Sequence, residues 1–201
     1  MSMQEKVLGA FQESIEVKKQ FVEKYSEMVS EAAAIIANAF SAGHKLIIFG
    51  NGGSSTDASH IAAEFVGRFV RERPGLPAIA LNTDMAVVTA LSNDYGYEEV
   101  FTRQLKALAS DGDVVVAIST SGNSLNVLKA VEAAKRKKLR VIALTGADGG
   151  KLAARVQYTF KVPSEVTARV QETHITLGHV LCQLVDEILF EAPRKKQLRK
   201  K

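Results

Sequence analysis

The chain has 201 residues, 46% of them hydrophobic and 24% charged, which is the composition of one soluble globular domain. It contains no signal segment and no apolar run approaching the roughly 20 residues of a transmembrane helix, so we expect a cytoplasmic protein without a membrane partner. Cys182 is the single cysteine, which excludes an intrachain disulfide. Because it lies in an apolar helical pattern, we expect a small buried side chain rather than a nucleophile.

The positive charge of the chain is concentrated at its C-terminus. The formal net charge is +4, but residues 194–201 carry six lysines and arginines and no acid, so the remainder has a net charge of −2. A short basic run of this kind is usually a solvated surface. We therefore expect a single domain over residues 1–192, a basic disordered tail over 193–201, and no nucleic-acid partner.

Apolar residues recur at helical spacing through the first 43 residues. The pattern predicts one helix over Gln4–Tyr25 and a second over Glu27–Ala42, with Gly43 as the stop. Two helices before the first strand are more than is needed to bury the faces of a small sheet. We expect these extra N-terminal helices (1–43) to pack against another subunit.

From Lys45 onward, short apolar strands alternate with helices. Strands are expected over Lys45–Phe49, Ala78–Leu81, Asp113–Ile118, Arg140–Leu144 and, at an edge, Gln157–Val162; helices are expected over Thr56–Val70, Met85–Leu91, Glu98–Ala109, Leu125–Lys135 and Val170–Phe190, with a short one after the Thr145–Gly150 loop. This order predicts an α/β three-layer sandwich, a five-stranded, mostly parallel sheet flanked by helices. Ligands of such sheets bind at the carboxyl ends of the strands.

The first strand runs into a glycine- and serine-rich turn, Gly50–Ser55. A helix that starts directly after such a turn offers free N–H groups to an anion. His60 and Glu64 follow at i and i+4, so they share one helix face and form a candidate acid–base or metal-ligand pair. Alternatively, His60 and Glu64 are an ordinary pair of polar side chains on the surface, without a function.

The Ser119–Ser124 loop also lies between a strand and a helix, and it carries four hydroxyls. Hydroxyl and backbone N–H groups at a helix N-terminus can hold a phosphate without a lysine. The alternative is a helix cap with extra serines. The third glycine of a dinucleotide fingerprint and the lysine of a triphosphate-binding loop are missing, so neither ligand is expected.

The last helix carries further candidates. Gln171 and His179 are eight residues apart, about 12 Å along a regular helix, so one helix does not easily bring both to one ion. Either Gln171 precedes the regular helix, or a neighbouring subunit completes the site. His174 points about 140° away from His179, which indicates a structural role or another site.

Four motifs, GNGGS, STSGNS, LTGADGG and RVQETHITLGH, resemble the sugar-isomerase (SIS) domain family. The resemblance runs to about Phe190 and is to the members that isomerise sedoheptulose 7-phosphate, the first step in the synthesis of lipopolysaccharide heptose. It implies a homotetramer with sites at subunit interfaces and one Zn²⁺ per subunit. It implies Glu64 as the base and His179 as the acid, and zinc ligation by His60, Glu64, Gln171 and His179.

The same resemblance implies a set of substrate contacts. The phosphate would be held by Ser119, Thr120, Ser121 and Ser124; the sugar would be contacted by Asn51, Gly52, Gly53, Asn93 and Asp94, together with Glu64 and Gln171.

Some positions depart from the isomerase pattern. Ser55 stands where some isomerases have histidine, and Ala168 where some have an acid. Pro77–Asp84 and Asp186–Phe190 resemble a non-catalytic tetrameric relative that binds the bacterial replication initiator. That relative lacks the catalytic glutamate and histidine, so their presence here favours the enzyme. Besides the enzyme and the initiator-binding protein, a third hypothesis is a module that senses a sugar phosphate without converting it.

Overall fold

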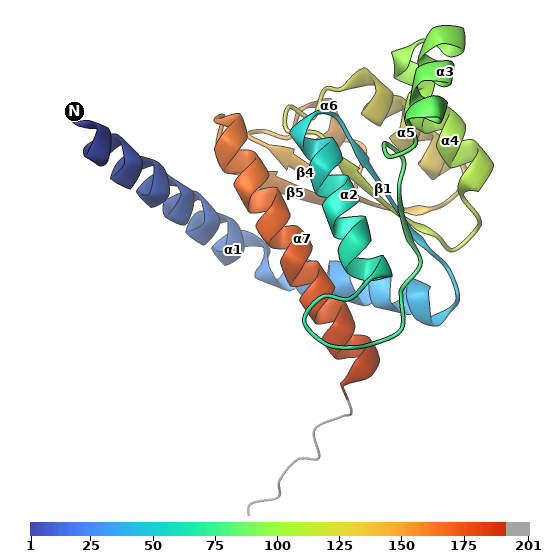
Figure 1. The fold of residues 1–201 in the computed structure, drawn as a ribbon, viewed down its shortest axis with the longest axis horizontal. Coiled ribbons are helices and arrows are strands. Elements are labelled where there is room, and N and C mark those ends of the chain that lie inside the picture. Colours follow the sequence, from blue (N-terminus) through green and yellow to red (C-terminus); the bar gives the residue numbers. More distant parts are fainter. Residues whose placement is uncertain (192–201) are drawn as a thin grey trace, which may run out of the picture.

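The computed structural model describes residues 1–191, and the predicted basic tail (193–201) lies outside them. The elements in chain order are α1 (Met3–Ser41), β1 (Leu46–Gly50), α2 (Gly53–Val66), β2 (Ala78–Ala80), α3 (Met85–Tyr95), the 3₁₀ turn η1 (Tyr97–Glu99), α4 (Val100–Leu108), β3 (Val114–Ile118), α5 (Leu125–Arg136), β4 (Arg140–Gly146), α6 (Gly150–Ala153), β5 (Tyr158–Val162) and α7 (Thr167–Phe190). Figure 1 shows them as a twisted sheet between two layers of helices.

The five strands form one sheet in the order β2-β1-β3-β4-β5, and every neighbouring pair is parallel. The predicted α/β sandwich is therefore confirmed, and β5 is at an edge as expected. β1, β3 and most of β4 are buried on both sides, because helices cover both faces of a parallel sheet.

Successive strand residues point into two separate cores. Ile48 and Val116 pack with α1, α2 and α7, whereas Ile47 and Val115 pack with α4 and α5. Helices α2 and α7 thus cover the same face of the sheet, and they contact one another along their length (Figure 1).

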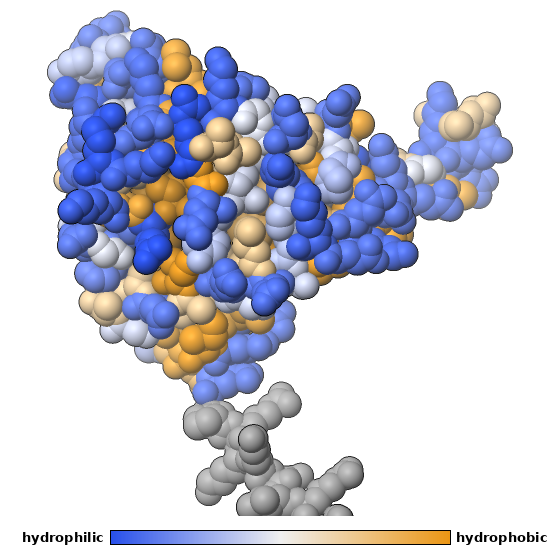
Figure 2. Space-filling view, turned by 180° about the vertical axis from the view of Figure 1, so that it is seen from behind, coloured by the Kyte–Doolittle hydropathy of each residue, from blue (hydrophilic) through white to orange (hydrophobic). Residues whose placement is uncertain are grey.

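The prediction of two N-terminal helices is wrong, because α1 is one continuous helix. Ser26, between the two predicted helices, is neither glycine nor proline, and the helical spacing runs on through Val22, Tyr25 and Val29. The first half of α1 projects away from the body as an arm (Figure 1). Figure 2 shows this arm from behind, with apolar residues among hydrophilic ones. Its exposed apolar residues are Met3, Val7, Leu8, Phe11, Ile15 and Val22.

Two further helix boundaries differ from the predictions. Helix α2 begins at Gly53 and ends at Val66, rather than running over Thr56–Val70. Helix α3 continues to Tyr95, beyond the predicted end at Leu91. The stop is Gly96, whose φ of 87° ends the helix.

Cys182 is fully buried in α7, and burial raises the pKa of its thiol to about 12. This confirms the expectation of an unreactive, small apolar side chain. Within residues 1–191, none of the helices has the length and apolar character needed to cross a membrane.

His174 has the structural role that was one of its two predicted alternatives. Its side chain is fully buried, and its Nε2 donates to the carbonyl oxygen of Thr145 at 3.2 Å. Burial lowers the pKa of His174 from 6.5 to about 4. The folded protein therefore keeps this imidazole neutral where the unfolded chain protonates it.

The free energy of unfolding should consequently fall as the pH decreases from about 6.5 to about 4, because only the unfolded state takes up this proton. Between pH 7 and pH 5 we expect this histidine to contribute a loss of about 2 kcal/mol. Urea unfolding of the wild type and of His174→Gln, at one protein concentration, measures it. Equal pH slopes for the two proteins would contradict the assignment.

Candidate active site

Helices α2 and α7 approach each other closely at the centre of their contact. A Cβ built on Gly178 of α7 would lie 2.6 Å from Cδ1 of Ile61 on α2. Any larger residue would require the Ile61 side chain to shift. Since His60 and His179 are the chain neighbours of these two residues, the close approach brings their imidazoles together.

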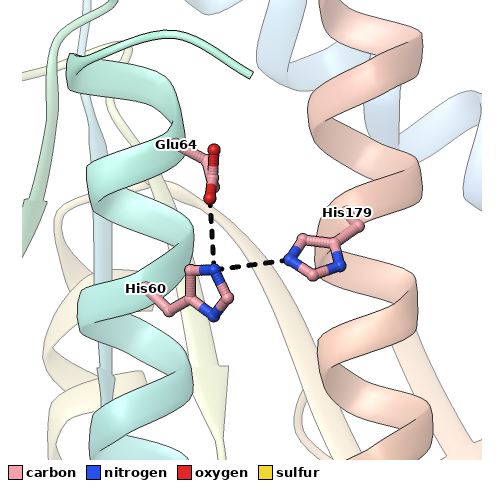
Figure 3. A group of neighbouring side chains, drawn as sticks. All are labelled: His60, Glu64 and His179. Atoms are coloured by element: carbon pink, nitrogen blue, oxygen red, sulfur yellow. Dashed lines mark hydrogen bonds and ion pairs between the residues drawn. The ribbon is translucent and has the colours of Figure 1, made fainter. Parts of the chain in front are cut away.

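Three side chains converge between the two helices (Figure 3). Nε2 of His60 lies 3.1 Å from Oε1 of Glu64 and 3.5 Å from Nε2 of His179. All three donor atoms lie within 4.8 Å of one another. The predicted His60–Glu64 pair is therefore joined by His179, which is 119 residues further along the chain than His60.

The donor atoms of this trio lie close enough together to hold a metal ion. Two histidine nitrogens and one carboxylate oxygen are a common ligand set of catalytic zinc, with a fourth position left open. Donors about 2.0–2.1 Å from one tetrahedral ion lie about 3.4 Å apart, close to the observed 3.1 and 3.5 Å. The three residues can thus hold a divalent metal with little rearrangement.

The trio is accessible from solvent but held by its neighbours. The side chains of His60 and Glu64 are 47% and 24% exposed. The ring of Phe69 stacks on His179 with centroids 5.6 Å apart. Asp57, one turn before His60, is partly buried; burial raises the pKa of its carboxyl group, and the charge of His60 opposes that shift.

Gln171 lies at the glycine turn. A Cβ on Gly53 would be 2.2 Å from its Nε2, so the amide packs directly over the first residue of α2. Gln171 is inside α7, which begins at Thr167, so the alternative that it precedes the regular helix is wrong. Its participation in a ligand set with His179 stays a prediction.

The side-chain amide of Asn51 is hydrogen-bonded to two other side chains of the same chain. Asn51 and Asn126 form a reciprocal amide pair with two hydrogen bonds of 2.9 Å. The Tyr97 hydroxyl donates to Oδ1 of Asn51, also at 2.9 Å. Asn126 and Tyr97 were missed by the sequence reasoning. Asn126 could have been noticed as a buried amide in the first turn of an apolar helix, whereas nothing in the sequence points to Tyr97.

The serine loop has the features of an anion site. Ser119 and Ser124 share a hydroxyl–hydroxyl hydrogen bond of 3.0 Å, and the Ser121 hydroxyl accepts from the Asn123 N–H at 3.2 Å. Ser124 is the residue before α5, yet its side chain makes no capping hydrogen bond. Ser124 is thus the N-cap residue by position, but its hydroxyl does not bond the first turn of α5. The Val127 N–H donates to Oδ1 of Asn126 at 2.9 Å, and the N–H groups before it can bind an anion.

A neighbouring loop holds the serine loop in place. The Gly122 carbonyl accepts from Leu152 N–H at 2.9 Å, and the Thr120 carbonyl accepts from Gly146 N–H at 2.9 Å. Gly122 has a φ of +64°, and a Cβ there would lie 2.0 Å from the carbonyl oxygen of Gly149. The loop shape thus depends on glycine at this position.

Asn93 and Asp94 are exposed in the last turn of α3, where the Asn93 amide donates to Oδ1 of Asp94 at 2.9 Å. In the described part of one chain, no hydrogen bond joins either side chain to the glycine turn or to the serine loop. Their predicted contact with a sugar stays a prediction.

Comparison with known proteins adds to this geometry. Residues 11–146 match the family model described as the SIS domain. The chain is 59% identical over 197 residues to the phosphoheptose isomerase of Thermodesulfovibrio yellowstonii, covering 98% of each chain. It is 55% identical to the phosphoheptose isomerase of Aquifex aeolicus, covering 94% of this chain and 99% of that one.

Solved structures agree with these sequence matches. The phosphoheptose isomerase of Neisseria gonorrhoeae superposes with a TM-score of 0.87 at 44% identity, covering 92% of this chain and 100% of that chain. The phosphoheptose isomerase of Francisella tularensis superposes with a TM-score of 0.89 at 36% identity, covering 93% and 100%.

The contact between the two loops predicts the effect of a single methyl group. Gly122→Ala should lower the free energy of unfolding by more than about 2 kcal/mol, because it adds a backbone clash to the strain of a left-handed alanine. Gly43→Ala is the matched control. Its φ is +81° and no atom lies within 4 Å of the added carbon, so it should cost only about 1–2 kcal/mol. Equal losses in denaturant melts would contradict the clash.

Proposed function

Because this chain belongs to the phosphoheptose isomerase family of SIS-domain proteins, we propose that it converts sedoheptulose 7-phosphate to D-glycero-D-manno-heptose 7-phosphate through an enediol. This would be the first step in the synthesis of lipopolysaccharide heptose. The observation that carries the proposal is the meeting of Glu64 and His179 beside His60.

The reaction requires a proton to leave C1 of the ketose and to return at C2 of the aldose. In the proposed mechanism, the Glu64 carboxylate takes the C1 proton and delivers it to C2. His179 protonates the C2 carbonyl oxygen as the enediol forms, and removes the proton of the C1 hydroxyl as the aldehyde forms. The two groups come from different helices, so they can act on different atoms of one bound sugar.

We further propose one Zn²⁺ per subunit, held by His60, Glu64 and His179, with Gln171 of the partner subunit as the fourth ligand. The spacing of the first three donors supports this. When bound, the metal would polarise the substrate carbonyl as a Lewis acid. His60 touches both other members, so it would orient them with or without metal.

The phosphate would be bound by the hydroxyls of Ser119, Thr120, Ser121 and Ser124 and by the N-terminus of α5. The sugar would be contacted by Asn51, Gly52, Gly53, Asn93, Asp94 and Gln171. Because the Asn51 amide is paired with Asn126, we expect Asn51 to act by holding the Tyr97 hydroxyl near the sugar. The lack of a capping hydrogen bond from the Ser124 hydroxyl supports this assignment of the phosphate.

A homotetramer with sites at subunit interfaces is the assembly we propose. Phe11 is 70% exposed on the arm, and α3 has no buried residue in the single chain. A second copy packed on these surfaces would cover them and could bring Asn93 and Asp94 to a site. The cytoplasmic location stays a prediction.

The base assignment predicts that Glu64→Gln abolishes turnover. The amide keeps the shape of the side chain but cannot accept the C1 proton, so we expect kcat to fall by at least about 10³-fold. Aldose formation from sedoheptulose 7-phosphate is measured with zinc present, and melting temperature and oligomeric state are compared with the wild type.

Two outcomes would contradict the proposal. Turnover retained by Glu64→Gln would remove the base assignment. No turnover by folded, zinc-loaded wild type would remove the enzyme and leave the initiator-binding or sugar-sensing hypothesis.

The exposed arm predicts that Phe11→Glu breaks the assembly. A charge in a buried apolar contact is costly, so we expect smaller species by light scattering. Gln12→Glu adds the same charge about 100° away around the helix and should leave the mass unchanged. A wild-type monomer would contradict the proposed tetramer.

A further inference from the structure

Arg73 is a buried arginine in the segment between α2 and β2. Its side chain is 1% exposed, and that of its partner Asp186 on α7 is 5% exposed. Arginine is almost never buried to this extent unless its donors are paired. The mechanism proposed above makes no use of either residue.

The guanidinium group binds backbone carbonyl groups at the end of α2. Its Nη2 donates to the carbonyl oxygen of Glu64 at 2.9 Å, and its Nη1 donates to the carbonyl oxygen of Phe65 at 2.6 Å. Weaker contacts run from Nη1 to the carbonyl oxygens of Gly67 and Pro74 at 3.3 and 3.1 Å. The last carbonyls of a helix lack partners within it and carry its negative dipole end, so a cation stabilises them.

The same side chain reaches across to α7. Nε of Arg73 donates to Oδ1 of Asp186 at 2.8 Å. Asp186 lies seven residues after His179, which is about two turns along the same face of the helix. One arginine therefore links the backbone of Glu64 to the helix that carries His179.

From this geometry we propose that Arg73 and Asp186 are a positioning pair for the active site. The pair fixes the end of α2 against α7 and so holds Glu64 and His60 at their distances from His179. It complements the close approach at Gly178, which lets the helices meet but does not prevent them from sliding. The catalytic part of this inference rests on the proposed function.

A suitable variant must weaken the link without leaving an unpaired buried charge, since that alone is strongly destabilising. Arg73→Lys keeps the positive charge beside Asp186. A single ammonium group cannot reproduce the planar fork that serves Glu64, Phe65 and Asp186 at once. The variant should therefore fold while the two helices lose their fixed spacing.

Two readouts separate positioning from simple stability, both taken well below the melting temperature. Zinc affinity of metal-free Arg73→Lys is measured by competition with a chelating dye, and we expect a loss of about 10–100-fold. In steady-state assays kcat should fall by a similar factor. KM should stay within about threefold, because the serine loop belongs to β3 and α5.

Asp113→Asn is the matched control. Asp113 is another buried acid, 2.6 Å from Nζ of Lys45, at the amino ends of β1 and β3 and away from α2 and α7. Loss of the Asp113 charge should lower the melting temperature yet leave zinc affinity and kcat unchanged.

Wild-type zinc affinity and kcat in Arg73→Lys would overturn the positioning role, as would equal losses in Asp113→Asn. Failure of the proposed function is distinguishable. If the wild type binds zinc but does not turn over sedoheptulose 7-phosphate, the zinc measurement alone decides the positioning role. If it turns over without binding zinc, the split between kcat and KM decides it.

Discussion

The close packing of α2 on α7 is the constraint on which this structure depends. The two helices follow β1 and β5, which are separated by two strands in the sheet, yet they cover the same face and touch. Gly178 against Ile61 allows the approach, and Arg73 with Asp186 joins the helices near their ends. Without that packing, His60 and His179 would be two unrelated surface histidines.

The sheet supplies the other half of the site. Parallel strands place the glycine turn after β1 and the serine loop after β3 at the same edge, because their carboxyl ends point the same way. The loop after β4 then holds the serine loop through backbone hydrogen bonds. The proposed anion site in the loops thus lies in the same domain as the proposed proton-transfer site between the two helices. A phosphorylated sugar, with a charged end and a reactive end, suits that division.

Local sequence patterns predicted the strands, the glycine turn and the His60–Glu64 pair, because each depends on residues close together in the chain. His179 was already a candidate on the last helix, but its place beside His60 came from the family resemblance, since it requires α7 to pack on α2. Arg73, Asn126 and Tyr97 were missed because their partners are 113, 75 and 46 residues away. The two predicted N-terminal helices are one helix, because the helical spacing continues past Ser26 without a glycine or proline. Spacing alone does not reveal where an apolar stripe changes from a buried face to an exposed arm.

The measurement that tests the central claim most directly is the origin of the hydrogen at C2 of the product. Conversion of sedoheptulose 7-phosphate in deuterated water, followed by NMR, should give aldose that carries solvent deuterium at C2. A proton held by the Glu64 carboxylate, whose side chain is 24% exposed, can exchange with water before it returns. Product without deuterium at C2, even after the reaction has reached equilibrium, would mean that the hydrogen moves from C1 to C2 without exchange with water, and would contradict a proton held on the solvent-exposed Glu64 carboxylate.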